Sequence, residues 1–520
     1  MSANPETAAP TGRQIIARGN ALGKMPPSNT RSPKGAKEGG ELPTGWKLVR
    51  LGDIAQTTSG GTPRRDKPQY YGGTIPWVKS GELGDRVVYE TSETLSGEGL
   101  ASSNAKIFPK GTLCIALYGA TVGKLGILGI DAATNQAVCA VFPPEGLDTR
   151  YLYRFFEGKR RELIKQGKGG AQSNISQGII RDTLLPVPPL PEQRRIVAEI
   201  EKQFTRLEAG VAALRRVQAN LKRYRAAVLK AACEGQLVPT EAELARQRVG
   251  CVPSRGTGRA KNAGSGEPAY NDAGYETGEQ LLQRILAERC QWFARQQAGA
   301  KAKKKYVEPS QPETIKLPSL PDGWTWGTWN QLSNWVTYGF TRPMPHVDQG
   351  IPIITAKGVN RGRIDFDGAH LTTRDAFGKL SEKDRPQPGD VLITKDGTIG
   401  RAAVVDTDRQ FCINQSVGVI WLRSCPMERK FLLTVIESEL TQKPIWAKAR
   451  GVAIQHLSIT DFAKMALPIP PLAEQTRIVA EVERRLSVVE ELESLVLANL
   501  QRAERLRQSI LQKAFTGDML

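Results

Sequence analysis

The chain has 520 residues, which is too long for one ordinary globular core and favours two or more domains. Lysine and arginine number 72 against 53 aspartate and glutamate residues, so the net charge of +19 makes a polyanion such as nucleic acid a candidate partner, although a merely basic protein would have the same balance. Three histidines and seven widely spaced cysteines without a C-x-x-C pair argue against a zinc site or a disulfide framework, and favour reduced thiols in the cytoplasm.

Residues 1–40 include the segments PPSN and SPKGAKEGG and no apolar run of the kind that a secretory signal requires, so we expect a disordered tail. Residues 41–190 then alternate short β-rich runs, such as TLCIALY and AVCAVF, with glycine, proline and asparagine turns. This alternation predicts a mixed, mainly β domain. Its most apolar stretch, residues 111–130, is interrupted by Lys124 and by glycines, so buried strands explain it better than a membrane span.

Prolines mark the point at which the periodicity changes. Pro188, Pro189 and Pro191 forbid a helix upstream and suit the start of one, which predicts a long helix over residues 191–236. Apolar residues from Ile196 to Val228 recur at intervals of three, four and seven along this helix. Such a seam is typical of a coiled coil and predicts that the helix packs against a partner helix.

Residues 237–320 differ in composition from both neighbours and are expected to be a linker. Residues 252–278 are rich in glycine, serine, arginine and asparagine, which predicts a flexible connection. Residues 279–297 have the apolar spacing of a short amphipathic helix. The basic run KAKKKY at residues 301–306 has two interpretations, a contact with phosphate or a solvated linker.

Residues 321–470 and 471–520 repeat the first domain and the first long helix. LPVPPLPEQRRIVAEIE, from Leu185, recurs as LPIPPLAEQTRIVAEVE from Leu467, an offset of 282 residues with thirteen of seventeen positions identical. Three further motifs of the first half have counterparts in the second half in the same order: PTGW corresponds to PDGW, GTLCIALYGATVGK to GDVLITKDGTIGR, and TNQAV to INQSV. We therefore predict an α/β (α+β) fold: two similar mixed, β-rich domains separated by two long antiparallel coiled-coil helices, duplicated with pseudo-twofold symmetry.

The motifs of common enzymes are not evident. GATVGK has three residues rather than four between its glycines and no serine or threonine after Lys124, so it departs from a phosphate-binding loop. An adenine methyltransferase would carry asparagine or aspartate before its two prolines, whereas Val187 and Ile469 precede them here. A scattered set of nuclease carboxylates would leave no motif. A self-sufficient DNA-modifying or DNA-cleaving enzyme with an unrecognised active site therefore stays open as the alternative hypothesis, beside a coiled-coil interaction protein.

PTGW with LGDI, then GGTPRRDKPQYYGGTIPWVKSGEL, LYGATVGK and the closing LPVPPLPEQRRIVAEIE, resembles the specificity subunits of type I restriction-modification systems. Because the pattern is duplicated, the resemblance covers nearly the whole of residues 41–520. Two features depart from it: the extended N-terminus, and WTWGTWNQL in the second half where the first has WKLVRLGDI.

The resemblance implies a non-catalytic subunit of a host defence complex. Each globular part would be a target recognition domain that reads one half of a split double-stranded DNA sequence. The long helices would act as a spacer and bind two methyltransferase subunits, with restriction and translocase subunits in the full complex. It implies no cofactor in this chain, and S-adenosylmethionine, ATP and Mg²⁺ on the partner subunits.

Phosphate contacts are expected from lysine and arginine, and base contacts from these and from small polar or amide side chains in turn-rich segments. The candidates in the first domain are Arg64, Arg65, Lys67, Lys79, Ser80, Lys124, Lys168 and Gln172. Those in the second domain are Arg342, Lys357, Arg361, Arg363, Lys395, Arg401, Arg450 and Gln455. For each, a solvated loop position is the competing interpretation. Tyr70, Tyr71 and Trp77 could stack on an extruded base or anchor a small core.

Overall fold

The computed structural model describes residues 42–167, 174–250, 274–297, 305–313, 317–360, 362–451 and 455–519. Its internal contacts divide the chain into two compact units. Unit 1 comprises the chain up to Arg215 together with the segment from Leu497 onward, and unit 2 is Arg216–Val496. Over the described residues, no helix combines the length and the apolarity that a membrane crossing needs.

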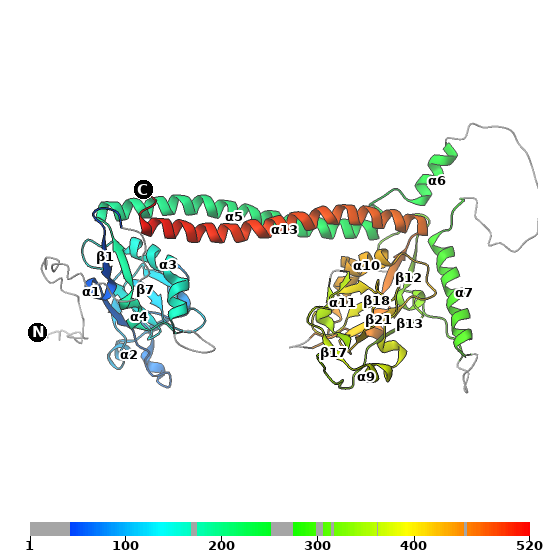
Figure 1. Ribbon diagram of the computed structural model, residues 1–520, viewed down its shortest axis with the longest axis horizontal. Coiled ribbons are helices and arrows are strands. Elements are labelled where there is room, and N and C mark those ends of the chain that lie inside the picture. The colour runs from blue at the N-terminus through cyan, green and yellow to red at the C-terminus, as the bar shows by residue number, and fades with distance from the viewer. Residues whose placement is uncertain are drawn as a thin grey trace, which may run out of the picture. The chain divides into compact units, whose positions relative to one another are not determined.

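Unit 1 contains the first domain, which is built on three β-sheets (Figure 1). The five-stranded sheet has the order β2 (Gln56–Ser59), β10 (Val138–Phe142), β7 (Leu113–Ala116), β8 (Leu125–Leu128), β4 (Arg86–Val88). The four-stranded sheet has the order β5 (Glu93–Leu95), β3 (Tyr71–Val78), β9 (Ala132–Thr134), β6 (Ile107–Phe108). Strands β1 (Lys47–Arg50) and β11 (Leu184–Val187) form an antiparallel pair. The helices are α1 (Leu51–Ile54), α2 (Gly97–Ala101), α3 (Thr149–Gln166) and α4 (Gln177–Asp182), with 3-10 turns at Pro68–Tyr70 and Ser80–Glu82.

The core of the first domain lies between its central sheet, helix α3 and both long helices. Helix α3 begins where the Asp148 side chain accepts hydrogen bonds from the next backbone N–H groups, a normal N-cap. Its buried aromatic face, including Tyr151 and Phe155, packs in one cluster with Ile200 from the first long helix and Leu511 from the second. Because burying such side chains drives folding, the long helices complete this domain rather than merely carry it.

Unit 2 contains the second domain, which has a similar plan with smaller sheets. Its central sheet has the order β13 (Trp335–Tyr338), β21 (Val417–Trp421), β18 (Val391–Thr394), β19 (Ala402–Val404). The second sheet has the order β17 (His370–Thr372), β14 (Ile351–Ile354), β20 (Cys412–Ile413). Two further sheets have two strands each: β12 (Thr325–Thr328) pairs with β22 (Ala466–Ile469), and β15 (Val359–Asn360) pairs with β16 (Arg363–Ile364). The helices are α8 (Trp329–Leu332), α9 (Arg374–Gly378), α10 (Arg429–Glu437), α11 (Glu439–Ala447) and α12 (Ile459–Ala463), with 3-10 turns at Ala356–Gly358 and Glu382–Asp384.

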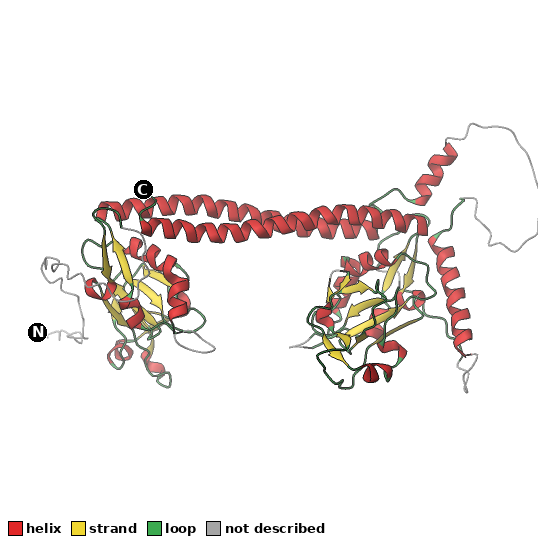
Figure 2. Ribbon diagram, viewed as in Figure 1, coloured by secondary structure: helices red, strands yellow, loops and turns green. Residues whose placement is uncertain are grey.

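Two helices are far longer than the others (Figure 2). Helix α5 (Leu190–Cys233) has 44 residues and α13 (Leu472–Thr516) has 45. In unit 1, Glu208 of α5 pairs with Arg507 near the end of α13, and in unit 2, Arg225 near the end of α5 pairs with Glu490 of α13. The later residue of α5 thus pairs with the earlier residue of α13, which is the order expected of antiparallel helices. This confirms the fold class predicted from the sequence, two similar mixed domains with long antiparallel helices.

Two shorter helices lie between α5 and the second domain in sequence, α6 (Glu241–Gly250) and α7 (Gly278–Gln297). Helix α7 falls within one residue of the predicted amphipathic helix, and its Leu281 and Ile285 are buried in the core of unit 2. Helix α6 was not predicted. The predicted disordered tail at residues 1–40, most of the flexible connection at 252–278 and most of the basic run at 301–306 lie outside the described residues.

Candidate DNA interface

Several turns of the first domain meet at one end of its central sheet. Val138 pairs with Ala116 and Cys139 with Ser59, so the chain leaves β2 and β7 at the same end at which it enters β10. The backbone N–H of Asn135 donates to Val78 O at 3.0 Å, which brings the residues after β3 to the same place. The turn Asn135–Ala137 thus lies beside the segments that carry most of the first domain's candidate DNA-binding residues.

Close packing of backbone segments fixes this arrangement. A Cβ atom on Gly60, directly after β2, would lie 2.0 Å from the carbonyl oxygen of Thr134. The equivalent residue after β13, Gly339, has no more room, because its Cβ would lie 1.9 Å from Ile413 O. Only glycine fits at such a close approach, so the sequence dictates the position of these turns in both domains.

The second domain gathers its turns in the same way. Thr394 pairs with Val417 and Tyr338 with Gly418, which places the turn before β21 beside the loop after β18. Ser416 Oγ in that turn accepts from the N–H of Ala356 at 2.9 Å, next to the candidate Lys357. Two further backbone hydrogen bonds attach the segment that carries Arg450 and Gln455 to the loop after β18. Leu457 N donates to Lys395 O at 2.7 Å, and Gly397 N donates to Gln455 O at 2.9 Å.

Some of the predicted DNA-binding residues make ion pairs with acidic side chains of the same domain. Arg64 pairs with Asp66 at 2.8 Å, and Arg65 and Lys79 each contact Glu93 at 2.6 Å. Hydrogen bonds from Arg65 and then Lys79 hold the pKa of Glu93 below its usual value, so this carboxylate stays charged and partly offsets the two cations. Ser80 begins the 3-10 turn that follows Lys79.

The aromatic residues beside this cluster are structural anchors. Trp77 is only 1% exposed and donates its indole N–H to Gly61 O at 3.1 Å, and the Tyr71 hydroxyl donates to Pro63 O at 2.6 Å. The Arg65 guanidinium lies over both rings, 4.6 Å from the centroid of Tyr71 and 5.1 Å from that of Trp77. Tyr71 and Trp77 therefore build the platform that holds Arg65, and Trp77 is too deeply buried to stack on a base.

Other candidates carry charge that no partner neutralises among the described residues. This group makes no ion pair there and consists of Lys67, Lys124, Lys357, Arg363, Arg401 and Arg450. All are exposed except Lys124, which is half-buried at the end of the loop between β7 and β8. Such cations at one end of a sheet suit the phosphate backbone of a nucleic acid.

The remaining candidates of the second domain are engaged locally. Lys395 pairs with Asp396 at 2.9 Å, Arg342 donates to Lys379 O at 2.8 Å, and Gln455 donates to Gly451 O at 2.7 Å. Lys168, Gln172 and Arg361 lie outside the described residues.

The structure adds residues that the sequence did not single out. His456 Nδ1 lies 2.8 Å from the carboxylate of Asp396, so the loop after β18 is joined to a segment 60 positions farther on. Tyr338, 40% exposed on the edge strand β13, has the Lys395 ammonium 5.1 Å from its ring centroid. The sequence holds only weak signals for these residues. Asp396 directly follows the candidate Lys395, whereas His456 belongs to no recognisable motif.

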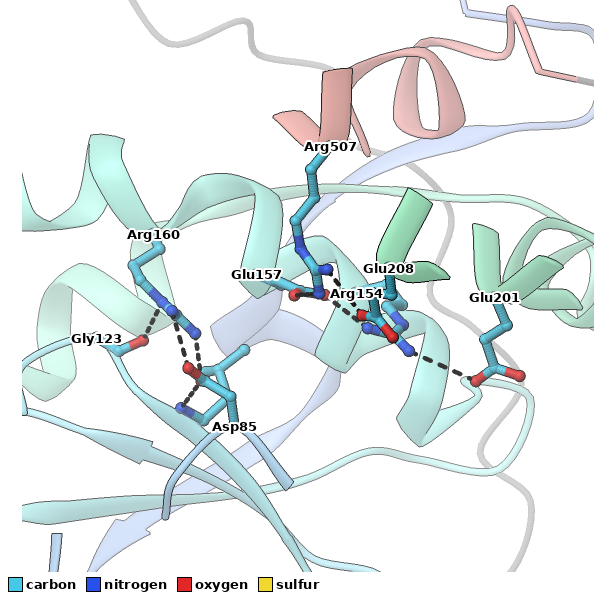
Figure 3. A network of polar contacts seen from close by, with 9 residues as sticks. Asp85, Gly123, Arg154, Glu157, Arg160, Glu201, Glu208 and Arg507 are labelled. Carbon is cyan, nitrogen blue, oxygen red and sulfur yellow. Dashed lines mark hydrogen bonds and ion pairs between the residues drawn. The ribbon is translucent and has the colours of Figure 1, made fainter. Parts of the chain in front are cut away.

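A helix side chain supports the glycine-containing loop in each domain. Arg160 of α3 donates from Nε to Gly123 O at 2.8 Å and also pairs with Asp85, whose backbone φ of 59° is unusual for a non-glycine residue (Figure 3). Gln442 of α11 donates to Gly400 O, also at 2.8 Å. The loops that carry Lys124 and Arg401 are thus tied to the helices behind the sheet.

The most strongly repeated motifs form the joint between each domain and its long helix. The indole N–H of Trp46 donates to Glu192 at 3.1 Å, and that of Trp324 donates to Glu474 at 3.0 Å. Burial raises the pKa of Glu474. Next to these glutamates, Gln193 accepts from Asp148 N at 2.8 Å, as Gln475 does from Glu428 N at 2.9 Å. PTGW and PPLPEQ are therefore architectural motifs and do not themselves lie among the candidate DNA contacts.

These features define a class: a duplicated protein whose two mixed domains are mounted on long antiparallel helices and gather basic turns at one end of the sheet. The type I restriction modification DNA specificity domain matches residues 43–213 and again residues 345–494. The chain belongs to this family of DNA specificity proteins and carries two target recognition domains.

Relatives of similar length support the assignment. The chain is 24% identical over 392 residues to the type I restriction enzyme EcoBI specificity subunit of Escherichia coli, covering 75% of this chain and 69% of that one. It is 23% identical over 500 residues to the EcoDI specificity subunit of Escherichia coli, covering 92% and 90%. A solved chain from a study of assembly and conformational transition of the type I R-M system has the same fold, with a TM-score of 0.59, 21% identity, and coverage of 92% of this chain and 100% of that one.

Proposed function

We propose that this chain recognises a bipartite double-stranded DNA sequence, each domain reading one half, and that it does so as a non-catalytic subunit. The observation that carries the proposal is the recurrence, in both domains, of basic turns around one Asn-Gln turn, at Asn135 and at Asn414. Phosphate contacts from the unpaired cations would position each domain, and side chains of the same turns would reach base edges. The two domains differ in these turns, so their half-sites differ as well.

The long helices would present the surface for protein partners. Several of their large apolar side chains are exposed: Val217 and Tyr224 on α5, and Val488, Leu492, Leu497 and Leu506 on α13. Exposed apolar positions along helices suit a protein interface. We infer that two methyltransferase subunits dock there and that restriction and translocase subunits join them, in the cytoplasm where the DNA lies. S-adenosylmethionine, ATP and Mg²⁺ then belong to those partners, and this chain needs no cofactor of its own.

Neither the relatives nor the family gives support to the alternative of a self-sufficient enzyme. The purified chain is therefore expected to transfer no methyl group from S-adenosylmethionine to target DNA and to leave the DNA uncut. Methyl transfer by the chain alone would overturn the non-catalytic assignment.

Exchange of one domain tests the two-reader proposal. Residues 42–186 are replaced by the equivalent domain of a relative, and the sequence methylated by the assembled complex is determined. One half of the recognised sequence should change and the other half should stay. A change in both halves would contradict the proposal.

A further inference from the structure

Three charged residues in unit 1 join the first domain to both long helices, and we call them the first clasp: Glu157, Arg507 and Glu208 (Figure 3). Arg507 of α13 contacts Glu157 of α3 at 2.7 Å through Nη2 and Glu208 of α5 at 3.1 Å through Nη1. Only 11% of the Glu157 side chain and 35% of the Arg507 side chain are exposed. The contact is therefore better shielded from water than an ordinary surface ion pair.

Neighbouring side chains hold the first clasp in place. Arg154 of α3 also contacts Glu157, at 2.8 Å, and the Arg507 guanidinium lies 4.0 Å from the ring centroid of buried Phe204. One residue farther along α13, Gln508 donates to Gly158 O at 2.7 Å. With the planar guanidinium lying on an aromatic ring and both of its terminal nitrogens in ion pairs, Arg507 has little freedom to move.

Unit 2 contains the same construction, the second clasp: Glu437, Arg225 and Glu490. Arg225 of α5 contacts Glu437 of α10 at 3.3 Å and Glu490 of α13 at 3.6 Å. Both arginine and helix glutamate recur at the repeat offset of 282 residues, Arg225 as Arg507 and Glu208 as Glu490. The domain glutamates also correspond, because each is the ninth residue of its helix. The duplication has therefore kept a three-residue contact whose members come from separate parts of the chain.

In each clasp, the arginine belongs to the helix that follows the other domain in the chain. The first domain is joined to α5 by the chain itself and by Gln193, and apolar side chains such as Leu511 pack it against α13, to which Arg507 adds a polar contact. The second domain is joined to α13 by the chain and by Gln475, and it packs against apolar residues of α5, to which Arg225 adds a polar contact. Apolar packing is non-directional, whereas an arginine held between two carboxylates has a defined geometry and so restricts the angle of the domain.

The clasp in the first domain also lies close to the loop that faces the proposed DNA. Glu157 and Arg160 stand three residues apart on α3, and Arg160 donates to Gly123 O beside the candidate Lys124. Residues three apart project from nearly the same face of a helix. A tilt of α3 against the long helices would therefore move this loop.

We propose that Arg507 and Arg225 are positioning residues that fix the angle of each target recognition domain on the long helices, and so restrict the spacing between half-sites that the protein accepts. This inference rests on the proposed bipartite recognition. Base preference within each half-site would not depend on the clasps, because the hydrogen bonds that hold the reading turns together lie inside each domain and involve neither Arg507 nor Arg225.

The experiment uses the complex assembled with its methyltransferase subunits and carrying Arg507→Gln or Arg225→Gln. The matched controls are Arg505→Gln and Arg223→Gln, which remove the same charge from exposed positions two residues away and are themselves repeat equivalents. Methylation rates are measured on DNA with the native spacer and with spacers one base pair shorter and longer. The ratio of these rates is the spacer discrimination.

Each clasp variant should lower spacer discrimination on the order of tenfold, the effect of losing one partly shielded charged contact. The half-site base preferences should stay unchanged, and both controls should match the wild type. Arg507→Lys, which keeps the charge but not the two-nitrogen geometry, should restore part of the discrimination.

Two results would overturn the inference: unchanged discrimination in a folded clasp variant, or an equal loss of activity on every spacer together with a lower melting temperature. The double variant Glu157→Gln/Arg507→Gln supplies a second check, since its spacer discrimination should be no lower than that of Arg507→Gln alone. If the wild-type complex itself reads no split sequence, the proposed function fails, which is distinguishable from failure of the clasps alone.

Discussion

Replacing Gln193 by alanine should loosen the joint between the first domain and α5. The Gln193 side chain is fully buried, accepts from Asp148 N at 2.8 Å, and donates to Pro188 O at 2.9 Å and Gly146 O at 3.0 Å. Each buried polar group left without a partner costs about 1–3 kcal/mol. Because part of this loss is recovered where water can enter, we expect a total near 2–4 kcal/mol, or a melting shift of roughly 5–15 °C for a unit of this size.

Differential scanning calorimetry of the chain measures this shift directly. Gln475→Ala should destabilise unit 2 by less, because Gln475 makes two such bonds, to Glu428 N and Pro470 O, rather than three. Gln501→Ala, at an exposed position of α13, is the control and should leave the transitions unchanged. A Gln193→Ala protein that melts like Gln501→Ala would refute the assignment of PPLPEQ as the domain-to-helix joint.

Three further predictions concern the reading surfaces and the helices. The assembled complex carrying Lys357→Gln and Arg401→Gln should show a log affinity against log salt plot shallower by about 2, since each phosphate contact adds about 0.9 to the slope; an unchanged slope would remove both residues from the interface. Gly60→Ala should abolish binding to one half-site or lower the melting temperature, because the added Cβ would clash with Thr134 O. Gly81→Ala should leave both DNA binding and the melting temperature unchanged, because its added Cβ would meet nothing within 4 Å. Four residues inserted near Ala212 and opposite it in α13 should lengthen the helices by about 6 Å, and sequencing of methylated sites should show a spacer longer by one or two base pairs of about 3.4 Å each.

The repeat and the periodicity carried most of the information about the fold. The prolines at 188–191 and the apolar seam after them predicted a helix over residues 191–236, and α5 spans Leu190–Cys233. Helix α6 was missed because its ten residues follow the end of α5 without an apolar period of their own, and were assigned to the linker.

Only part of the candidate DNA interface can be predicted from the sequence. Residue type and turn context were enough to select Lys67, Lys357 and Arg401, which are exposed and make no ion pair with any described residue. The same reasoning could not tell that Arg65 is held on two aromatic rings, because that depends on contacts across a folded sheet. Arg507 and Glu157 are 350 positions apart, and no local pattern links residues at such a separation.

Sequencing of methylated bases tests the central claim most directly. The chain is expressed together with its methyltransferase partner in a host that lacks DNA methylation, and again with the partner alone. The account predicts one methylated motif with two specific halves and a nonspecific spacer of fixed length, present only when this chain is expressed. A continuous motif, or the same methylation without this chain, would contradict it.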